Sequence, residues 1–411
     1  MRIKDSQDWK RDTFIFIASQ TLSLMGSMTV SFAIIWYITL KTSSGFLMTL
    51  SIVSSFVPQI LISLFAGVWA DRYDRKKLII YADIFIAVPT LLLAFLFIYG
   101  HTSIGFIFLI SIIRSIGTGV QSPAVGAILP QIVPMEKLMK VNGISSTIGS
   151  VMMLVSPALS GLLLSVFGLS ATLFLDFATA AVAVAVLSFL SVAARLKSPD
   201  EEDPNVMKEL KAGIAYVRSH TLIKYLLVFY ALFFFLITPA AFLTPLMVGR
   251  SFGSDVWRLT ANEISWSMGC LIGGLIVTMT GGFKNKIYTM ALSCIAFGVL
   301  FALLGLAGNF TLYLAIMLIA GVFMPFFGTA ETVLIQEQVP ENMLGRVFSI
   351  IQIIASAVLP LGMVLFGPLA DIVSIEWIMI VTGSLMAVLG IYIFMNKKLM
   401  KLNDYRHMES E

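Results

Sequence analysis

The sequence is short of charge, cysteine and histidine, and each shortage removes a class of protein. Charged residues make up 12% of the 411-residue chain, about half of the roughly 25% found in soluble domains. The two cysteines, Cys270 and Cys294, lie in apolar stretches, so they are expected to pack as small hydrophobic groups without a disulfide framework. The three histidines are far apart, and neither H-E-x-x-H nor a phosphate-cradling G-x-x-x-x-G-K-[ST] occurs. We therefore expect no catalytic residues, no metal and no cofactor.

Long apolar runs are what the sequence has in abundance. Hydrophobic residues make up 58% of the chain, against about 45–50% in soluble domains, and a membrane-spanning helix needs roughly 20 apolar residues in a row. The runs are unbroken, which excludes an outer-membrane barrel with its alternating strands. Twelve candidate spans lie at about 13–39, 45–70, 78–99, 103–128, 142–167, 170–194, 222–248, 259–281, 287–307, 310–335, 347–370 and 375–395.

The basic residues are distributed unequally between the two sides of these spans. Of the 27 Lys and Arg residues, 23 lie at the termini or in connections on the side of the termini, three lie on the other side, and Arg114 is inside a span. Basic residues favour the cytoplasmic side. The distribution predicts a membrane protein with both termini in the cytoplasm, and the family resemblance given below implies a bacterial-type plasma (inner) membrane.

The two halves of the chain are related in sequence. Segment 131–144, QIVPMEKLMKVNGI, aligns with segment 337–350, EQVPENMLGRVFSI, at an offset of 206 residues. Such a parallel repeat is typical of transporters built from two six-helix bundles. The predicted fold is an all-α integral membrane protein, with twelve transmembrane helices in two pseudo-symmetric six-helix bundles around a central cavity. The predicted parts are an N-terminal bundle at 1–194, a cytoplasmic linker with a short amphipathic helix at 195–221, a C-terminal bundle at 222–396 and a cytoplasmic tail at 397–411.

The connection after the second span carries a dense set of charges. It reads GVWADRYDRKK from Gly67 to Lys77, and it resembles the G-x-x-x-D-R-x-x-R-[KR] signature of the major facilitator superfamily of transporters. Gly67 is expected to let two helices approach closely, and Asp71 to accept from helix amides and pair with an arginine. The resemblance implies a conformational latch made of Gly67, Asp71, Arg72, Arg75 and Lys76, with Glu337 and Arg346 in the second half.

Three further stretches extend the resemblance over most of the chain. The strings WADRYDRKKLIIYADI, IIRSIGTGVQSPAVGAILPQIVP and LGRVFSIIQIIASAVLPLGMVL resemble the macrolide-efflux branch of bacterial drug exporters within this superfamily. In the fourth span Arg114, Gly117 and Gly119 resemble the signature R-x-x-x-G-x-G, with the glycine spacing one residue short. That resemblance implies proton coupling at Arg114.

The fifth span resembles the antiporter signature G-P-x-x-G-G. The matching residues are Ser156, Pro157, Ser160 and Gly161, with serine in place of two glycines. Serine still permits close helix contact, so the resemblance implies exchange of substrate against protons. The same residues also suit an ordinary proline kink with small packing neighbours.

Five charged residues fall inside the predicted spans, namely Asp83, Arg114, Asp176, Glu263 and Glu331. A charge near the bilayer centre costs at least about 2.5–3.5 kcal/mol, so such residues face a cavity or a partner. A buried carboxyl group can carry a proton, and an arginine beside it makes a protonatable switch. We expect proton coupling at Arg114, Asp176, Glu263 and Glu331, and we expect Asp83 to be a structural partner for the cations of the preceding loop.

The resemblance implies a secondary active transporter that exports amphipathic, macrolide-like drugs by proton antiport and alternating access. The alternatives are an exporter of an endogenous amphiphile, such as a lipid or siderophore, and a transporter-fold receptor. The expected partners are a small amphipathic substrate and membrane lipid, without nucleic acid, and one chain is expected to function as a monomer. The driving force is expected to be the proton gradient rather than a cofactor.

Overall fold

A computed structural model describes residues 8–190, 206–280 and 285–396. Throughout these ranges the chain is helical, without strands, and twelve helices are long and apolar enough to cross a membrane. The helices are α1 (Asp8–Thr42), α2 (Gly45–Arg72), α3 (Arg75–Ile98), α4 (Ile104–Ile132), α5 (Met135–Phe167), α6 (Leu169–Ser188), α7 (Val206–Ser219), α8 (Thr221–Phe242), α9 (Thr244–Ser251), α10 (Val256–Thr280), α11 (Lys286–Leu304), α12 (Phe310–Gln338), α13 (Glu341–Leu369) and α14 (Ile375–Met395).

The chain divides into two compact units. The first unit comprises Met1–Thr42, Leu50–Glu201 and Asp255–Thr260. The second unit comprises Ser43–Thr49, Glu202–Ser254 and Ala261–Glu411, so it includes the first turn of α2. The predicted tail at 397–411 and the start of the predicted linker lie outside the described residues.

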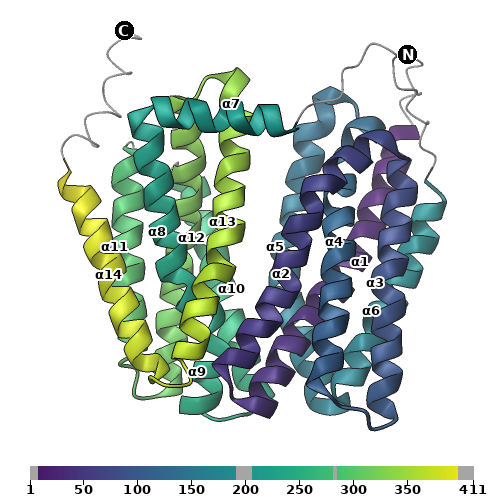
Figure 1. The fold of residues 1–411 in the computed structure, drawn as a ribbon, viewed down its shortest axis with the longest axis horizontal. Coiled ribbons are helices and arrows are strands. Elements are labelled where there is room, and N and C mark those ends of the chain that lie inside the picture. The colour runs from purple at the N-terminus through teal and green to yellow at the C-terminus, as the bar shows by residue number, and fades with distance from the viewer. Residues whose placement is uncertain (1–7, 191–205, 281–284, 397–411) are drawn as a thin grey trace. The chain divides into compact units, whose positions relative to one another are not determined.

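Each unit is held together by the same pattern of helix contacts. In the first unit α1 packs on α5 and α6, while α3 packs on α4 and α6. In the second unit α8 packs on α13 and α14, while α11 packs on α12 and α14. The helices of each unit can be followed by colour in Figure 1. The predicted fold class is therefore confirmed, with twelve candidate spans in two related helix bundles.

The repeat found in the sequence is also present in the backbone. Helices α4 and α12 begin and end at an offset of 206 residues, and so do the first residues of α5 and α13. Between them Val133 and Val339 have φ/ψ of −111°/132° and −111°/128°, and each is followed by a proline at the next helix N-cap. Both valines are buried. Because proline cannot continue the preceding helix, the Val-Pro pair makes the same corner in both units.

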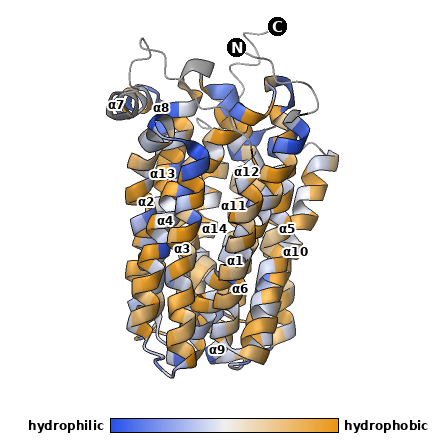
Figure 2. Ribbon diagram, turned by 90° about the vertical axis from the view of Figure 1, so that its right-hand side faces the viewer, coloured by the Kyte–Doolittle hydropathy of each residue, from blue (hydrophilic) through white to orange (hydrophobic). Residues whose placement is uncertain are grey.

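Hydrophobic residues cover the helices along most of their length, and hydrophilic residues gather at helix ends (Figure 2). This is the distribution that hydrocarbon requires, because a helix satisfies its own backbone groups there while charges stay near water. The seventh span, Thr221–Ser251, is divided into α8 and α9 at Leu243. Pro239 and Pro245 flank this break and explain it, since each lacks an amide donor.

Helix α7 lies within the stretch 195–221, for which a linker with a short amphipathic helix is predicted. This helix packs on α13 within the second unit, and the contact is made through Gly213, which is buried. A methyl group at Gly213 would lie 3.1 Å from Ile350 Cδ1 and 3.2 Å from Arg346 Cβ. Ile214, the next residue, is 39% exposed. The glycine therefore sets the face of α7 that packs on α13.

Two helices of the second unit approach each other at glycines. A Cβ atom built on Gly269 of α10 would lie 2.1 Å from the backbone oxygen of Leu318 in α12, and one on Gly321 would lie 2.4 Å from the oxygen of Trp266. No side chain fits at such distances. These glycines thus bring the two backbones together, as small residues do at helix interfaces in membranes.

Candidate functional site

A buried ion pair links α4 and α6 in the first unit. The Arg114 guanidinium donates to a carboxylate oxygen of Asp176, and its Nη1 also donates to Thr90 Oγ1 of α3 at 2.6 Å. The Ser27 hydroxyl of α1 is 3.4 Å from the other Asp176 oxygen. Arg114 is 7% exposed and Asp176 is 1% exposed. We call these four residues the ion-pair layer.

Glycines allow the helices around the ion-pair layer to pack closely against one another. A Cβ atom on Gly26 of α1 would lie 2.1 Å from Thr179 Oγ1 and 3.0 Å from Asp176 Oδ1, so α1 meets α6 directly beside the pair. On α4, Gly117 would place a Cβ 2.5 Å from Ile86 of α3, and Gly119 would place one 2.8 Å from the Gln59 oxygen of α2. The two glycines that follow Arg114 in the sequence signature therefore seat α4 against two neighbouring helices.

Asp83 of α3 belongs to a second polar group, and the prediction that it pairs with loop cations is wrong. Its Oδ1 accepts a hydrogen bond from Ser23 Oγ of α1 at 2.7 Å and another from Gln121 Nε2 of α4 at 2.6 Å. Asp83 is 2% exposed, which keeps it away from the solvated loop. We call Ser23, Asp83 and Gln121 the Asp83 layer.

Two basic side chains in the first turn of α3 bind backbone oxygens of three other helices in the first unit. Arg75 is 9% exposed, and its guanidinium donates to the Ala70 oxygen at 2.8 Å and to the Ala127 oxygen of α4 at 2.5 Å. Lys76 Nζ donates to the oxygens of Ser188 and Leu190, both at 2.8 Å, at the carboxyl end of α6. A cation is favourable at that end of a helix.

Three other members of the predicted latch remain predictions. A Cβ atom on Gly67 would meet nothing within 4 Å among the described residues, so the close helix approach expected at Gly67 stays a prediction. Arg72 is exposed at the end of α2. The Asp71 side chain lies outside the described residues, so its predicted part in the latch stays a prediction.

The remaining residues of the predicted latch lie on α12 and α13 of the second unit. Glu337 is exposed near the end of α12, and Arg346 is half-buried in α13. Arg346 Nη1 lies 3.3 Å from Met343 Sδ of its own helix, and α7 packs against its Cβ through Gly213. Their predicted joint action remains a prediction.

The predicted antiporter residues form a buried face of α5. Ser156, Pro157, Ser160 and Gly161 are all buried. A Cβ atom on Gly161 would lie 2.0 Å from Thr260 Oγ1, which belongs to the same unit. The hydroxyl oxygens of Ser156 and Ser160 have no hydrogen-bond partner among the described residues. These positions are packed as tightly as the resemblance implies, while their part in exchange stays a prediction.

The second unit places its two intramembrane carboxyl groups beside tyrosines. Glu263 of α10 accepts from Asn262 Nδ2 at 3.1 Å, and Asn262 Oδ1 accepts from the buried Tyr313 hydroxyl of α12 at 2.9 Å. Glu331 of α12 is half-buried, and its charge acts on the buried Tyr230 of α8. Among the described residues neither glutamate forms an ion pair with a cation, in contrast to Asp176.

Aromatic side chains from three helices pack together in the interior of the second unit. The rings of Phe233 in α8 and Phe327 in α12 stack with centroids 4.0 Å apart, and Phe297 of α11 packs 5.8 Å from Phe233. Ring pairs at such distances contribute about 0.5–1.5 kcal/mol beyond their burial. Phe327 lies four residues before Glu331 on α12, so the two side chains share a face of that helix.

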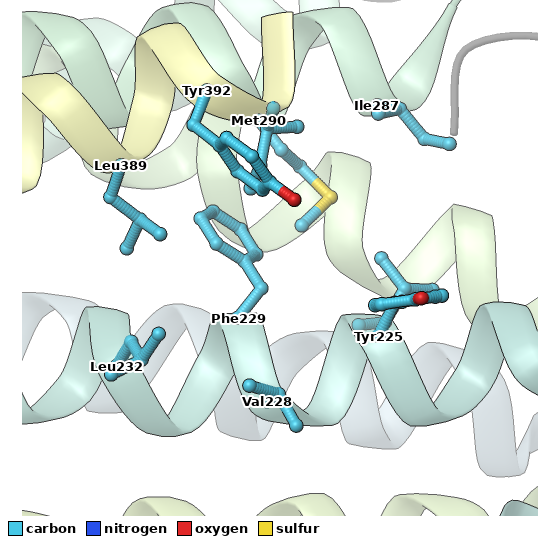
Figure 3. Close-up of a pocket in the computed structure, with 10 residues that line it drawn as sticks. Tyr225, Val228, Phe229, Leu232, Ile287, Met290, Leu389 and Tyr392 are labelled. Atoms are coloured by element: carbon cyan, nitrogen blue, oxygen red, sulfur yellow. The ribbon is translucent and has the colours of Figure 1, made fainter. Parts of the chain in front are cut away.

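An apolar groove runs between α8, α11 and α14 of the second unit (Figure 3). In Figure 3 the Phe229 ring points from α8 toward Met290 and Tyr392. The volume of the groove is about 90 Å³, well below the roughly 300–1,000 Å³ of sites for drug-sized ligands. The groove is lined by Tyr225, Leu226, Val228, Phe229, Leu232, Ile287, Met290, Leu389, Tyr392 and Ile393. It is too small to be the substrate cavity.

Sequence reasoning missed a polar cluster at one end of the second unit. Asp371, just beyond α13, accepts hydrogen bonds from the backbone amides of Gly45 and Phe46 at 2.7 and 2.9 Å, from Ser44 Oγ at 3.0 Å and from Arg250 at 2.8 Å. Asp371 therefore caps the amino end of α2 from the turn that follows α13. No short motif marks it, because the capping carboxylate is 326 residues from the amide of Gly45.

The charge of Asp371 is stabilised by this capping. Partial burial works to raise the pKa of Asp371, but the amides of Gly45 and Phe46, together with Arg250 and Ser44, outweigh it, so the pKa lies below its ordinary value of 3.8. Arg250 also donates to the Ala370 oxygen at 2.5 Å and to the Ser43 oxygen. The cluster remains charged at neutral pH.

The twelve spans, the repeated bundles and the charges buried in mid-helix define a multi-pass membrane transporter rather than an enzyme. The chain belongs to the Major Facilitator Superfamily, whose sequence profile matches residues 16–359 and 283–403. It is 31% identical to Macrolide efflux protein A of Streptococcus pyogenes over 401 residues, which cover 96% of this chain and 98% of that protein.

Two further similarities agree with this family. The chain is 25% identical to the Staphyloferrin A transporter of Staphylococcus aureus over 413 residues, which cover 96% of this chain and 99% of that protein. A crystal structure of the nucleoside transporter NupG matches with a TM-score of 0.68 at 15% identity, over 94% of this chain and 98% of that one. The structural likeness shows the fold, and the sequence relatives support efflux.

Proposed function

We propose that this protein exports amphipathic, macrolide-like compounds from the cytoplasm by proton antiport with alternating access. The observation that carries the substrate class is the 31% identity to Macrolide efflux protein A over nearly the whole of both chains. The buried Arg114–Asp176 pair supports the coupling. Both termini are placed in the cytoplasm by the distribution of basic residues, the inner membrane is the proposed location, and one chain is the proposed working unit.

The ion-pair layer provides a physical basis for coupling. Arg114 and Asp176 stabilise each other only while they are paired, because an unpaired charge is costly inside a bundle. A movement that separates α4 from α6 must therefore be accompanied by proton uptake on the carboxylate or by a new partner for the arginine. Glu263 and Glu331 are the further proposed coupling residues, placed beside tyrosines in the second unit.

The proposal is tested in proteoliposomes with erythromycin as the macrolide and an imposed pH gradient. We expect erythromycin to drive proton movement, and the gradient to drive erythromycin movement, in opposite directions. Asp176→Asn should abolish the coupled movement. Asp255→Asn is the matched control, because Asp255 is exposed and pairs only locally with Arg258 at 3.1 Å. If the unaltered protein transports erythromycin at the same rate with and without a pH gradient, the proposal of antiport is overturned.

A siderophore or lipid exporter is the second candidate. The similarity to a protein named Staphyloferrin A transporter, over 96% of this chain, favours this alternative specifically. The same proteoliposomes separate the two candidates when a carboxylate siderophore and a phospholipid are tested beside erythromycin. Proton movement with the siderophore and none with erythromycin would retain the coupling and replace the substrate class.

A further inference from the structure

The first unit arranges its two polar layers along the same helices. On α3, Asp83 and Thr90 are seven residues apart, and on α4, Gln121 and Arg114 are also seven apart. Seven residues are two helical turns, or about 10 Å. Asp83 meets Gln121 in one layer, and Thr90 meets Arg114 in the other. The Asp83 layer therefore lies two turns along α3 and α4 from the ion-pair layer, on the same helix faces.

The two carboxyl groups of these layers are satisfied differently. Asp176 receives a guanidinium and a hydroxyl, so both of its oxygens have donors. Asp83 has two donors on Oδ1, whereas Oδ2 is buried and has no partner in the described structure. An unpaired buried acceptor costs about 1–3 kcal/mol, and more when it carries charge.

Among the residues that the structure describes, Asp83 has no compensating cation. From α1 it faces the hydroxyl of Ser23, and from α4 the amide of Gln121. From α6 it faces the negative charge of Asp176. Arg114 of α4 is engaged with Asp176 and Thr90. A second negative charge in this interior is unfavourable, whereas a neutral carboxylic acid with its proton on Oδ2 avoids it.

We propose that Asp83 is a proton-binding site and that it carries the proton exchanged in transport. This rests on the proposed antiport function, and it assigns the carrier to a residue outside the ion-pair layer. The proton leaves Oδ2 for water when the bundle opens that face to the cytoplasm. The resulting carboxylate then attracts Arg114, which moves from Asp176 along the α3 face. Proton release at one layer thereby loosens the ion pair at the other.

The test combines a spectroscopic readout with a transport readout on the full-length protein. Infrared difference spectra across a pH titration should show the carbonyl stretch of a protonated carboxylic acid in the unaltered protein, and Asp83→Asn should remove that band. In proteoliposomes Asp83→Asn should continue to exchange erythromycin across the membrane while losing erythromycin-driven proton release. Asp83→Glu, which restores a titratable group, should recover part of the release.

Each other outcome identifies which proposal fails. If Asp83→Asn keeps the infrared band, or releases protons as the unaltered protein does, Asp83 is not the carrier. If the unaltered protein moves no protons with any substrate, antiport fails, while loss of the band in Asp83→Asn would still establish the proton site. If Asp83→Asn and Asp83→Glu both fail to fold, the titration of the unaltered protein with an isotope label on aspartate decides the assignment. A band insensitive to that label would overturn it.

Discussion

The two units have the same arrangement of helices but differ in where charged side chains are buried. At the repeat offset of 206 residues, Arg114 corresponds to Ala320 and Asp176 to Thr382. Ala320 and Thr382 are buried too, and the Thr382 hydroxyl bonds to the Ile378 oxygen of its own helix at 2.7 Å. The ion pair is therefore not required to build this bundle. Its presence at these positions of the first unit is consistent with the role in proton coupling that we propose for it.

The second unit uses its interior differently. It stacks aromatic rings on the face of α12 that also carries Glu331, and it links Glu263 to Tyr313 through Asn262. Aromatic side chains offer a large apolar contact area to bulky amphipathic ligands, and a carboxylate can meet a cationic group on such a ligand. From this comparison we expect the ion pair of the first unit to be the main site of proton coupling and the aromatic interior of the second unit to contact substrate.

The largest effect is expected when one partner of the ion pair is removed. Arg114→Ala should lower the free energy of unfolding by roughly 3–5 kcal/mol, because Asp176 is left buried and unpaired. Adding Asp176→Thr gives the first unit the residues of the second and should recover most of that loss without restoring transport. Thermal unfolding in detergent measures both. A double variant no more stable than Arg114→Ala would contradict the comparison.

A smaller effect is expected from the glycines. Gly269→Ala should lower stability by about 1–3 kcal/mol, since a methyl group there collides with the backbone of α12. Gly67→Ala and Gly274→Ala are the controls, because a Cβ at either position meets nothing within 4 Å among the described residues. Both should stay within about 0.5 kcal/mol. Equal losses at all three positions, measured by thermal unfolding, would refute the packing argument.

Asp371→Ala should lower the free energy of unfolding by about 0.5–2 kcal/mol, the usual contribution of a helix cap. Because the folded-state pKa of Asp371 is lowered, its stabilisation is present above the ordinary value of 3.8 and disappears as the pH falls through the folded-state pKa. The difference between the variant and the unaltered protein should therefore be constant around neutral pH and shrink in acid. Thermal unfolding over a pH series checks this. A stability difference that grows in acid would contradict this prediction.

The smallest effect concerns Lys76 at the end of α6. Lys76→Gln should cost about 0.3–1 kcal/mol, because the cation interacts with the last carbonyls of that helix. Lys77 is exposed on the next position, so Lys77→Gln is the control and should change little. Hydrogen exchange at the carboxyl end of α6 reports the difference. Identical hydrogen exchange in the two variants would show that Lys76 does not cap α6.

Hydropathy and the repeat were enough to predict the fold. The spans follow from run length, and the Val-Pro corners follow from the aligned segments, because proline fixes the backbone there. Charge inside apolar runs also identified Arg114 and Asp176. Their pairing could not be predicted, because the two residues are 62 positions apart and depend on which faces of α4 and α6 meet.

The wrong prediction came from using closeness in sequence to infer a contact between side chains. Asp83 lies close in sequence to the charged loop, yet its side chain is directed to α1 and α4. Helix periodicity defines faces, but neighbouring helices decide which face is buried.

The most direct test of the account is erythromycin-driven proton release from proteoliposomes carrying Asp83→Asn, Asp176→Asn or the control Asp255→Asn. We predict that release is lost in the first two variants and persists in Asp255→Asn, whose carboxylate is exposed. Release that persists in both Asp83→Asn and Asp176→Asn would contradict the account.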